Sequence, residues 1–309
     1  LDDDGGVHAD LTISRLSTDR YRVVTGGADG NQDWVTLRNY RDDMGLEADI
    51  NIRTHDMATL GLWGPKAKDA LGHFIDPNEI SIENFPFVAA KHLTLNLSGG
   101  KSIDVWAARI SYVGESGWEI YLNNDTEEGL ALYDSLLEVG VVPVGIETYA
   151  NSRRLEKSLR LQNADLETDY NLHEADLARK LVKKADFHGK AAYVAQKAAD
   201  QQASYLCTMV MLKNVDASGV ARYPVGEWPI LNKETREVLL DEFGRRSICT
   251  SVEYGPSLGS NIILGYIPAE FASVGTELLL EYFCEEYPIR IEAVGYAPLL
   301  DPENLRVRS

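Results

Sequence analysis

Cysteine is scarce in this chain of 309 residues, and the histidines lack the spacing of metal ligands. The three cysteines, Cys207, Cys249 and Cys284, lie far apart and form no CxxC pair, which argues against a zinc site or a redox-active pair. The six histidines show no HExxH or HxH spacing, so we expect no metal centre. Sparse cysteine is typical of reducing compartments, and we expect a cytoplasmic protein, or a mitochondrial-matrix protein in a eukaryote.

Long apolar runs and concentrated positive charge are also missing. No stretch approaches the roughly 20 apolar residues of a membrane-spanning helix, so we expect no membrane association. The 48 acidic and 30 basic residues give a net charge of −18, which disfavours nucleic acid as a partner because phosphate binding requires clustered cations. No GxGxxG or Walker motif occurs, so the usual signals of dinucleotide and nucleotide sites are lacking.

The pattern of apolar residues predicts helices and strands along the first 200 residues. Apolar and polar residues alternate over 7–14, which predicts a strand. Further strands are predicted at 20–25, 92–97, 103–112 and 117–122. Helices are predicted at 33–44, from Pro65, and at 126–139 with Asp125 or Thr126 as its cap. This mixture favours an α+β or α/β body.

After about residue 203 the sequence pattern changes from alternating helices and strands to short strands alone. Short strands are predicted at 205–213, 246–253, 261–267, 276–283 and 287–295. Glycine and proline separate these runs, as in a small barrel or sandwich. We therefore divide the chain into residues 1–200 and 201–309. Because the chain begins with Leu1 and enters a strand pattern at once, we expect it to be a piece of a longer polypeptide.

Asp10 is the first candidate for chemistry. It follows Gly5 and Gly6 and shares the polar face of the predicted strand with Thr12. A carboxylate there can accept a proton or bind an amine, and the neighbouring hydroxyl can orient it. The alternative is an exposed strand face on which Asp10 is merely solvated.

The segment RISYVGESGWEIY at 109–121 is the second candidate. Gly114 and Gly117 indicate a turn between two strands, which would bring Tyr112 and Glu119 to one pocket. A glutamate can accept two hydrogen bonds from an aminopyrimidine edge, and Tyr112 and Trp118 could pack on a flat ring. The alternative is a hairpin with surface charges.

The segment RRLEKSLR at 153–160 is the third candidate. Four cations, Arg153, Arg154, Lys157 and Arg160, fall within eight residues of an otherwise acidic chain. On a helix, three of them would lie near one face and offer a patch for an anionic ligand tail. The alternative is a solvated helix face.

Taken in order, these segments resemble the tetrahydrofolate-binding aminomethyltransferases. That family includes the T-protein of the glycine cleavage system and the C-terminal halves of dimethylglycine and sarcosine dehydrogenases. The tail and the lysine of RLEK are more similar to the dehydrogenase branch. The similar segments are GGVHADLT, LGLWGPKAKDAL, NFPF, RISYVGESGWEIY, SRRLEK, KKADFHGK, GEWPI, CTSVEYGPSLG and PLLDPENLRVRS.

The resemblance implies an α+β fold. It consists of a ferredoxin-like folate-binding domain, N-terminally incomplete in this chain, followed by a small C-terminal β-barrel. It also implies that Asp10 is catalytic and that Thr12, Tyr112, Glu119 and Arg154 bind folate. The implied reaction transfers an aminomethyl or methyl group from a methylated amine or iminium donor to tetrahydrofolate, forming 5,10-methylenetetrahydrofolate. A flavin domain with FAD upstream, or a lipoyl carrier protein, is the implied partner.

The sequence departs from the family pattern at glycines. The family's R-L-E-K-G-Y has Ser158 for its glycine, a glycine-acid pair becomes Asn163-Ala164-Asp165, and E-A-G-L has Asp176 for its glycine. These changes leave two alternatives open, a folate-dependent S- or O-demethylase and a folate-binding paralogue without turnover. The K-G-C-x-x-G-Q-E motif of relatives in iron–sulfur assembly is missing, because residues 183–190 contain no cysteine.

Overall fold

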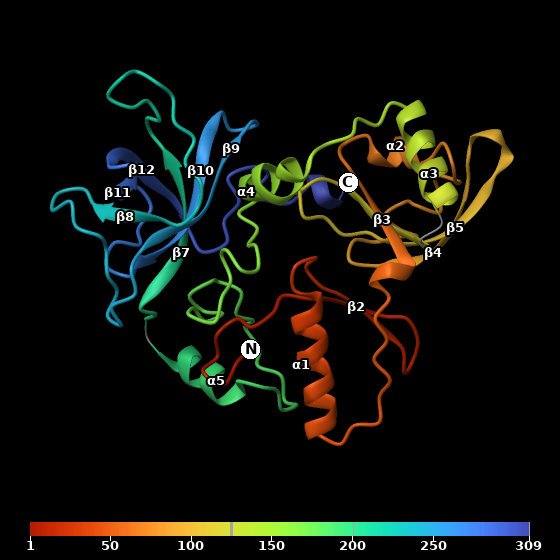
Figure 1. The fold of residues 1–309 in the computed structure, drawn as a ribbon, viewed down its shortest axis with the longest axis horizontal. Coiled ribbons are helices and arrows are strands. Elements are labelled where there is room, and N and C mark those ends of the chain that lie inside the picture. Colours follow the sequence, from red (N-terminus) through yellow and green to blue (C-terminus); the bar gives the residue numbers. More distant parts are fainter. Residues whose placement is uncertain (124–125, 200, 309) are drawn as a thin grey trace. The chain divides into compact units, whose positions relative to one another are not determined.

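The computed structural model describes residues 1–123, 126–199 and 201–308. Contacts between residues group the chain into two compact units, both drawn in Figure 1. The barrel unit contains Leu1–Asp10 and Ile146–Pro302, and the sheet unit contains Leu11–Gly145 and Glu303–Ser309. The division into residues 1–200 and 201–309 was inferred from the change in sequence pattern, and it stays a prediction. Each unit has a hydrophobic core of its own and is described separately.

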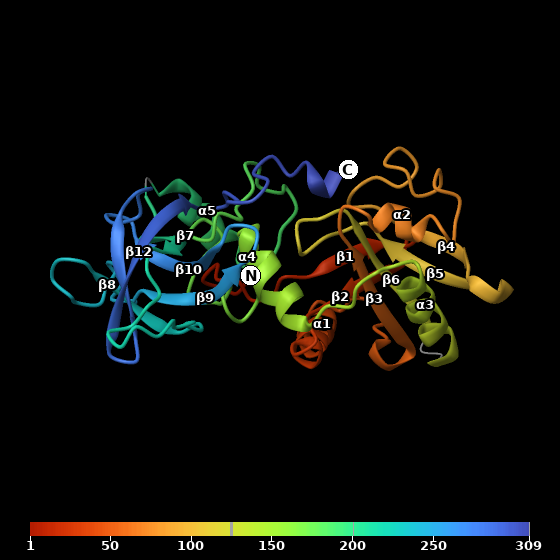
Figure 2. The same ribbon diagram turned by 90° about the horizontal axis from the view of Figure 1, so that it is seen from above.

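The sheet unit is built around four antiparallel strands in the order β3 (Met57–Trp63), β6 (Gly117–Asn123), β5 (Ser102–Ala108) and β4 (Ala90–Asn96). One face packs on α2 (Ala67–Leu71) and α3 (Thr126–Glu138), which lie on the same side of the sheet in Figures 1 and 2. Alternation explains this core, since every second strand residue points to the helices. The strands predicted at 92–97 and 117–122 and the helix at 126–139 are confirmed, and the strand predicted at 103–112 is confirmed as far as Ala108. The proposed cap Asp125 lies outside the described residues.

The remainder of the sheet unit consists of a short ribbon and a helix. The strands β1 (Thr12–Arg15) and β2 (Tyr21–Val24) pair antiparallel, with Thr12 opposite Val24. Helix α1 (Gly30–Asp43) follows and confirms the helix predicted at 33–44. A 3-10 turn, η1 (Thr54–Asp56), leads into β3.

The prediction of a strand over 7–14 is wrong in its first half, because pairing begins only at Thr12. The preceding backbone binds elsewhere in the barrel unit: the Val7 amide donates to the carbonyls of Glu167 (3.2 Å) and Tyr170 (3.3 Å). Gly6 approaches the Thr168 backbone so closely that a Cβ atom would overlap with its carbonyl. Gly6 therefore allows a close approach of two backbone segments, whereas Gly5 has a φ of 81°, which favours glycine.

The barrel unit closes six strands in the order β10-β7-β12-β11-β8-β9. Five match the predicted runs: β7 (Ser204–Met211), β9 (Ile248–Gly255), β10 (Ser260–Pro268), β11 (Glu277–Tyr282) and β12 (Glu285–Val294). The sixth, β8 (Trp228–Asn232), was not predicted, because a five-residue run that contains Pro229 gives a weak strand signal. Buried aliphatic side chains fill the interior. The expected α+β fold with a C-terminal barrel is confirmed.

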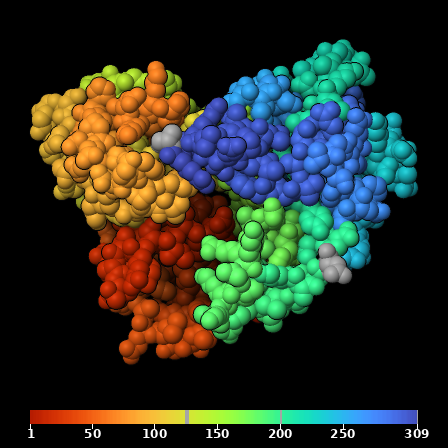
Figure 3. All heavy atoms as spheres, turned by 180° about the vertical axis from the view of Figure 1, so that it is seen from behind, coloured from red at the N-terminus to blue at the C-terminus, as the bar shows by residue number. Residues whose placement is uncertain are grey.

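Helical and irregular segments complete the barrel unit. A π-helical turn, η3 (Thr148–Arg153), continues into α4 (Arg154–Glu156), and α5 spans Lys190–Ala198. The segment between α4 and α5, drawn in green in Figure 3, is held to the barrel by Arg245, which pairs with Glu174. A last 3-10 turn, η4 (Arg306–Arg308), belongs to the sheet unit.

The positions at which the family pattern has glycine adopt left-handed backbone conformations in this chain. Ser158, Asn163 and Asp176 have φ of 53°, 62° and 52°. Two of them compensate through their side chains: Ser158 Oγ accepts from Thr208 Oγ1 at 3.0 Å, and Asp176 accepts from the Tyr296 amide at 2.7 Å. The fold therefore keeps the turn that glycine would favour and stabilises it with polar side chains.

Asn163 gives the simplest test of whether a residue other than glycine strains the backbone in the left-handed conformation. Asn163→Ala should lower the free energy of unfolding by about 1 kcal/mol, because alanine tolerates the left-handed region poorly. Asn163→Gly should change it by less than about 0.5 kcal/mol, since glycine adopts this conformation without a steric cost. Urea denaturation of both variants measures the difference, and equal stability of the two would contradict a strained turn.

Candidate functional site

Glu119 lies on the face of the four-stranded sheet that points away from α2 and α3. Its cross-strand neighbours are Gly61 on β3 and Ala108 on β5, so neither neighbour places a large side chain of its own beside the carboxylate. The hydroxyl of Tyr121, two residues along the same strand, donates a hydrogen bond to Glu119. Burial raises the pKa of the Glu119 carboxyl, and the bond from Tyr121 opposes this increase.

Aromatic side chains adjoin Glu119 on this surface, which we call the Glu119 face (Gly61, Trp63, Trp106, Glu119 and Tyr121). The rings of Trp106 and Tyr121 meet edge to face, with centroids 5.1 Å apart. The guanidinium of Arg22, on β2, lies 4.1 Å from the centroid of the Trp106 ring. Such a surface suits a flat, polar heterocycle, because the rings offer stacking and the carboxylate accepts N–H groups.

The β1–β2 ribbon reaches the same surface. Val24 packs against the cluster of Trp106, Ala108 and Tyr121, and Thr12 is the partner of Val24 in the ribbon. Thr12 itself is exposed. The structure therefore connects Thr12 to the Glu119 face through a single intervening residue.

Tyr112 lies in the connection between β5 and β6. The strand predicted to reach Tyr112 ends at Ala108, but the predicted hairpin is confirmed by the pairing of Trp106 with Tyr121. Arg109, almost fully buried, holds the start of this connection by donating to the carbonyls of Ile80 (3.3 Å) and Phe85 (2.8 Å). Tyr112 is half-buried in this anchored loop.

The prediction that Trp118 packs on a ligand beside Glu119 is wrong. Successive residues of a strand point to opposite faces, so Trp118 enters the core beneath the helices, where it is 0% exposed. Sequence reasoning instead missed Tyr121, which follows Glu119 by two residues and shares its face. The strand period was the signal that could have found Tyr121.

Asp10 is the last residue of the first segment of the barrel unit. Its side chain reaches solvent, yet the surrounding protein removes part of its water shell and raises the pKa of the carboxyl. Gln162 donates to the carbonyl of His8 at 3.4 Å, which fixes the backbone just before Asp10. The carboxylate is thus carried by an ordered segment.

The prediction that residues 153–160 form a basic patch on one helix face is wrong. Helix α4 ends at Glu156, and three of the four cations are buried: Arg154, Lys157 and Arg160. Lys157 donates to the carbonyls of Leu300 (3.0 Å) and Asp301 (2.6 Å). The positive charges here bind the protein's own carbonyls and carboxylates, which a local spacing argument could not foresee.

Arg154 is 1% exposed, and its guanidinium is surrounded by protein acceptors. It donates to Asp165, to Ser251 Oγ at 2.6 Å, and to the carbonyls of Ala150 (2.8 Å) and Leu159 (3.1 Å). Asp165 also accepts from Ser251 at 2.8 Å and from Thr250. The pair joins α4 to strand β9 of the barrel.

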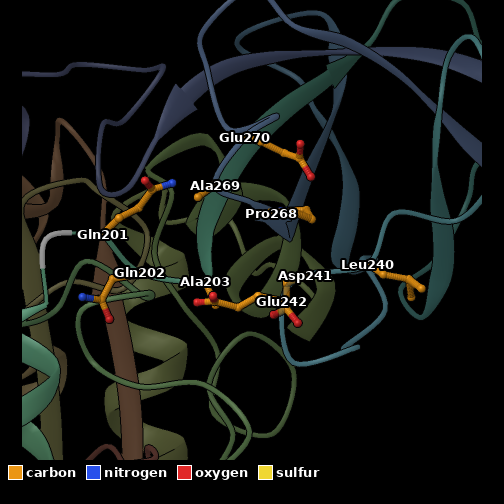
Figure 4. A pocket seen from close by; sticks show the side chains of 9 residues that line it. All are labelled: Gln201, Gln202, Ala203, Leu240, Asp241, Glu242, Pro268, Ala269 and Glu270. Atoms are coloured by element: carbon orange, nitrogen blue, oxygen red, sulfur yellow. The ribbon is translucent and has the colours of Figure 1, made fainter.

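An open polar pocket in the barrel unit contains none of the predicted site residues. It is lined by Gln201, Gln202, Ala203, Leu240, Asp241, Glu242, Pro268, Ala269 and Glu270 (Figure 4). Asp241, which lies inside, already binds Arg245 and Ser204. Among the described residues there is no group of three or more potential metal ligands, and no helix within them is long and apolar enough to cross a membrane.

Comparison with known proteins gives consistent matches along both units. Residues 1–185 match the family model described as GCVT N-terminal domain, and residues 226–294 match the model of the glycine cleavage T-protein C-terminal barrel domain. A crystal structure of the glycine cleavage system aminomethyltransferase T from Bartonella henselae has the same fold. Its TM-score is 0.77 at 22% identity, over 98% of this chain and 74% of that one.

Curated relatives are of two kinds. The mitochondrial dimethylglycine dehydrogenase of Rattus norvegicus is 31% identical over 98% of this chain and 33% of its own length, and the human one is 30% identical over 92% and 31%. An aminomethyltransferase of Listeria monocytogenes is 30% identical over 89% of this chain and 68% of its own length. The chain thus spans about a third of the dehydrogenases and two thirds of the aminomethyltransferase.

Proposed function

Because this chain belongs to the glycine cleavage T-protein family, we propose that it is a tetrahydrofolate-dependent one-carbon transferase. The donor is an iminium ion, which a flavin on a partner domain forms by removing two electrons and a proton from a methylated amine. A tetrahydrofolate nitrogen attacks the iminium carbon, the amine leaves, and the product is 5,10-methylenetetrahydrofolate. The single observation that carries the proposal is the half-buried Glu119 carboxylate, with the Tyr121 hydroxyl bound to it, on an aromatic surface of the sheet.

The chemistry of the Glu119 face fits a reduced folate. The pterin ring has a 2-amino group beside a ring N–H, and a carboxylate accepts both hydrogen bonds with one pair of oxygens. Tyr112 and Thr12 are proposed to complete this subsite, Tyr112 from the anchored loop and Thr12 from the ribbon. Bound tetrahydrofolate supplies the nucleophilic nitrogen for the transfer.

Asp10 is proposed as the catalytic carboxylate. Its Cα lies within about 7 Å of the Thr12 Cα, because only one residue separates them in the chain. A carboxylate near a cationic donor stabilises the positive charge and accepts the proton that leaves the attacking nitrogen. The raised pKa of Asp10 supports this role, since a more basic carboxylate is a better proton acceptor.

The resemblance implies that Arg154 binds folate. Because its guanidinium is already bound to Asp165, Ser251 and backbone carbonyls, we propose instead that Arg154 stabilises the barrel unit by fixing α4 against β9. Further parts of the proposal concern the whole protein: a flavin domain or a lipoyl carrier as partner, and a cytoplasmic or mitochondrial-matrix location. The mitochondrial dimethylglycine dehydrogenases among the relatives support the matrix location.

Glu119→Gln tests the proposal directly. Calorimetric titration with 5-formyltetrahydrofolate should show binding weakened about tenfold to a hundredfold, because two hydrogen bonds lose a charged acceptor. Asp104→Asn is the matched control, since Asp104 lies on the same sheet and binds Thr94 instead. Equal affinity of wild type and Glu119→Gln would contradict the proposal.

The same variant should change stability in a pH-dependent way. The raised pKa means that the folded chain holds the Glu119 proton more tightly than the unfolded chain does. Stability is therefore lost as pH rises from the usual glutamate pKa through the raised one. Glu119→Gln should melt at a higher temperature than wild type at pH 7, and this difference should vanish near pH 4, below about the usual glutamate pKa. A lower melting temperature at pH 7 would show that ionised Glu119 stabilises the fold.

A further inference from the structure

Trp63 lies across the backbone of its own strand on the Glu119 face. Residues 61 and 63 share one side of β3, since strand residues alternate. A Cβ atom at Gly61 would overlap with the ring carbons Cζ3 and Cη2 of Trp63. The six-membered ring of the indole thus occupies the space directly above Gly61, which only glycine leaves available.

Two further contacts fix the orientation of the indole. Its Nε1 donates to the carbonyl of Ile110 at 2.8 Å. Gly117 is the cross-strand partner of Trp63, and a Cβ atom there would lie 2.6 Å from Trp63 Cδ1. Glycines on two strands and one hydrogen bond therefore seat the ring in a single position. This arrangement depends on the two glycines, because any other residue at position 61 or 117 would place a side chain where the indole lies.

The seated indole adjoins the carboxylate proposed to bind the pterin. Gly61 is directly opposite Glu119 in the register, and such partners have Cβ positions about 5 Å apart. Part of the Trp63 surface is accessible to solvent, in contrast to Trp118, which is fully buried on the other face. An indole beside a carboxylate can stack on a ring whose edge that carboxylate binds.

We propose that the Trp63 indole, seated on Gly61 and Gly117, is the wall against which the pterin ring packs while its amino edge binds Glu119. The inference rests on the proposed function and adds a binding residue to it. Trp63 acts by contact with the ring, so its effect should follow the aromatic surface and not the indole N–H.

Titrations with 5-formyltetrahydrofolate and with 6-methyltetrahydropterin, which has the ring but no tail, test this inference. Trp63→Ala should weaken both ligands about tenfold, the usual effect of removing one stacking partner. Trp63→Phe keeps a ring and loses the bond to Ile110, and it should weaken them no more than about threefold. The control Trp34→Ala removes a tryptophan of helix α1 that contacts Arg38, and affinity should be unchanged.

Gly61→Ala supplies a second test that keeps the tryptophan. The added methyl group should displace the indole and weaken both ligands in the wild-type background. It should have no effect in the Trp63→Ala background, because the ring it would meet is gone. Melting temperatures confirm that each variant is folded.

Each outcome is decisive. If the wild type binds both ligands and Trp63→Ala binds them equally well, this inference is overturned but the proposed function is not. Equal losses in Trp63→Phe and Trp63→Ala would assign the effect to the hydrogen bond with Ile110 and would also overturn it. A wild-type chain that binds neither ligand would overturn the proposed function, and this inference with it.

Discussion

Asp10→Asn should reduce folate-dependent one-carbon transfer by about two to four powers of ten and leave folate affinity nearly unchanged. Asparagine preserves the size of the side chain but neither accepts a proton nor balances a cationic donor. The expected loss is thus in kcat and not in KM. Steady-state kinetics with a methylated amine donor and a flavin-dependent amine oxidase that converts it to the iminium ion, together with calorimetric titration of 5-formyltetrahydrofolate, separates the two effects.

The pH profile adds a second readout for Asp10. If the ionised carboxylate is required, activity is present above its pKa and is lost as pH falls through it. Because burial raises this pKa, the acidic limb of kcat/KM should lie above the usual value for aspartate. Asp4→Asn, an exposed carboxylate in the same segment, is the control and should leave the profile unchanged. Full activity of Asp10→Asn would refute the assigned role, and folate binding without turnover by the wild type would favour a non-catalytic paralogue.

Arg154→Met should lower the free energy of unfolding by about 3–5 kcal/mol, the usual cost of leaving one partner of a buried ion pair behind. Asp165 would remain buried and would lose its ion-pair partner, keeping the bonds from the Thr250 and Ser251 hydroxyls and the Leu161 amide. The loss should be large because both side chains are inaccessible, at 1% and 0% exposure. Urea denaturation measures it, and the slope of the transition shows whether the unfolding stays cooperative.

Two companion variants determine the source of this loss. Lys233→Met breaks an exposed pair with Glu277 on the same unit and should cost no more than about 1 kcal/mol. Adding Asp165→Leu to Arg154→Met removes the isolated charge, so part of the lost stability should return. A small effect of Arg154→Met, comparable with that of Lys233→Met, would show that the buried pair contributes little to the fold.

Local patterns predicted most of the strands, because alternation reports burial on one face, but β3 was not predicted and the first half of the strand expected at 7–14 does not form. The barrel strands β7 and β9–β12 were found in this way, and β8 was missed where Pro229 interrupts a short run. The hairpin with Tyr112 and Glu119 was predicted from its glycines. The error over Trp118 came from grouping neighbours in sequence, although adjacent strand residues face opposite sides.

Contacts between distant segments could not be predicted from local spacing. The cations of 153–160 look like a surface patch until their acceptors are known, and those acceptors lie far along the chain at Ser251 and Leu300–Asp301. The position of the Trp63 indole also depends on contacts between segments that are distant in sequence. Gly61 and Gly117 are 56 positions apart, and only the register of β3 with β6 brings both to one ring.

A crystal structure of the chain with 5-formyltetrahydrofolate tests the central claim most directly. The 2-amino nitrogen of the pterin should lie within hydrogen-bonding distance of the Glu119 carboxylate, with the ring against the Trp63 indole. Pterin density in another place, such as the polar pocket beside Asp241, with the Glu119 face left to solvent, would contradict it.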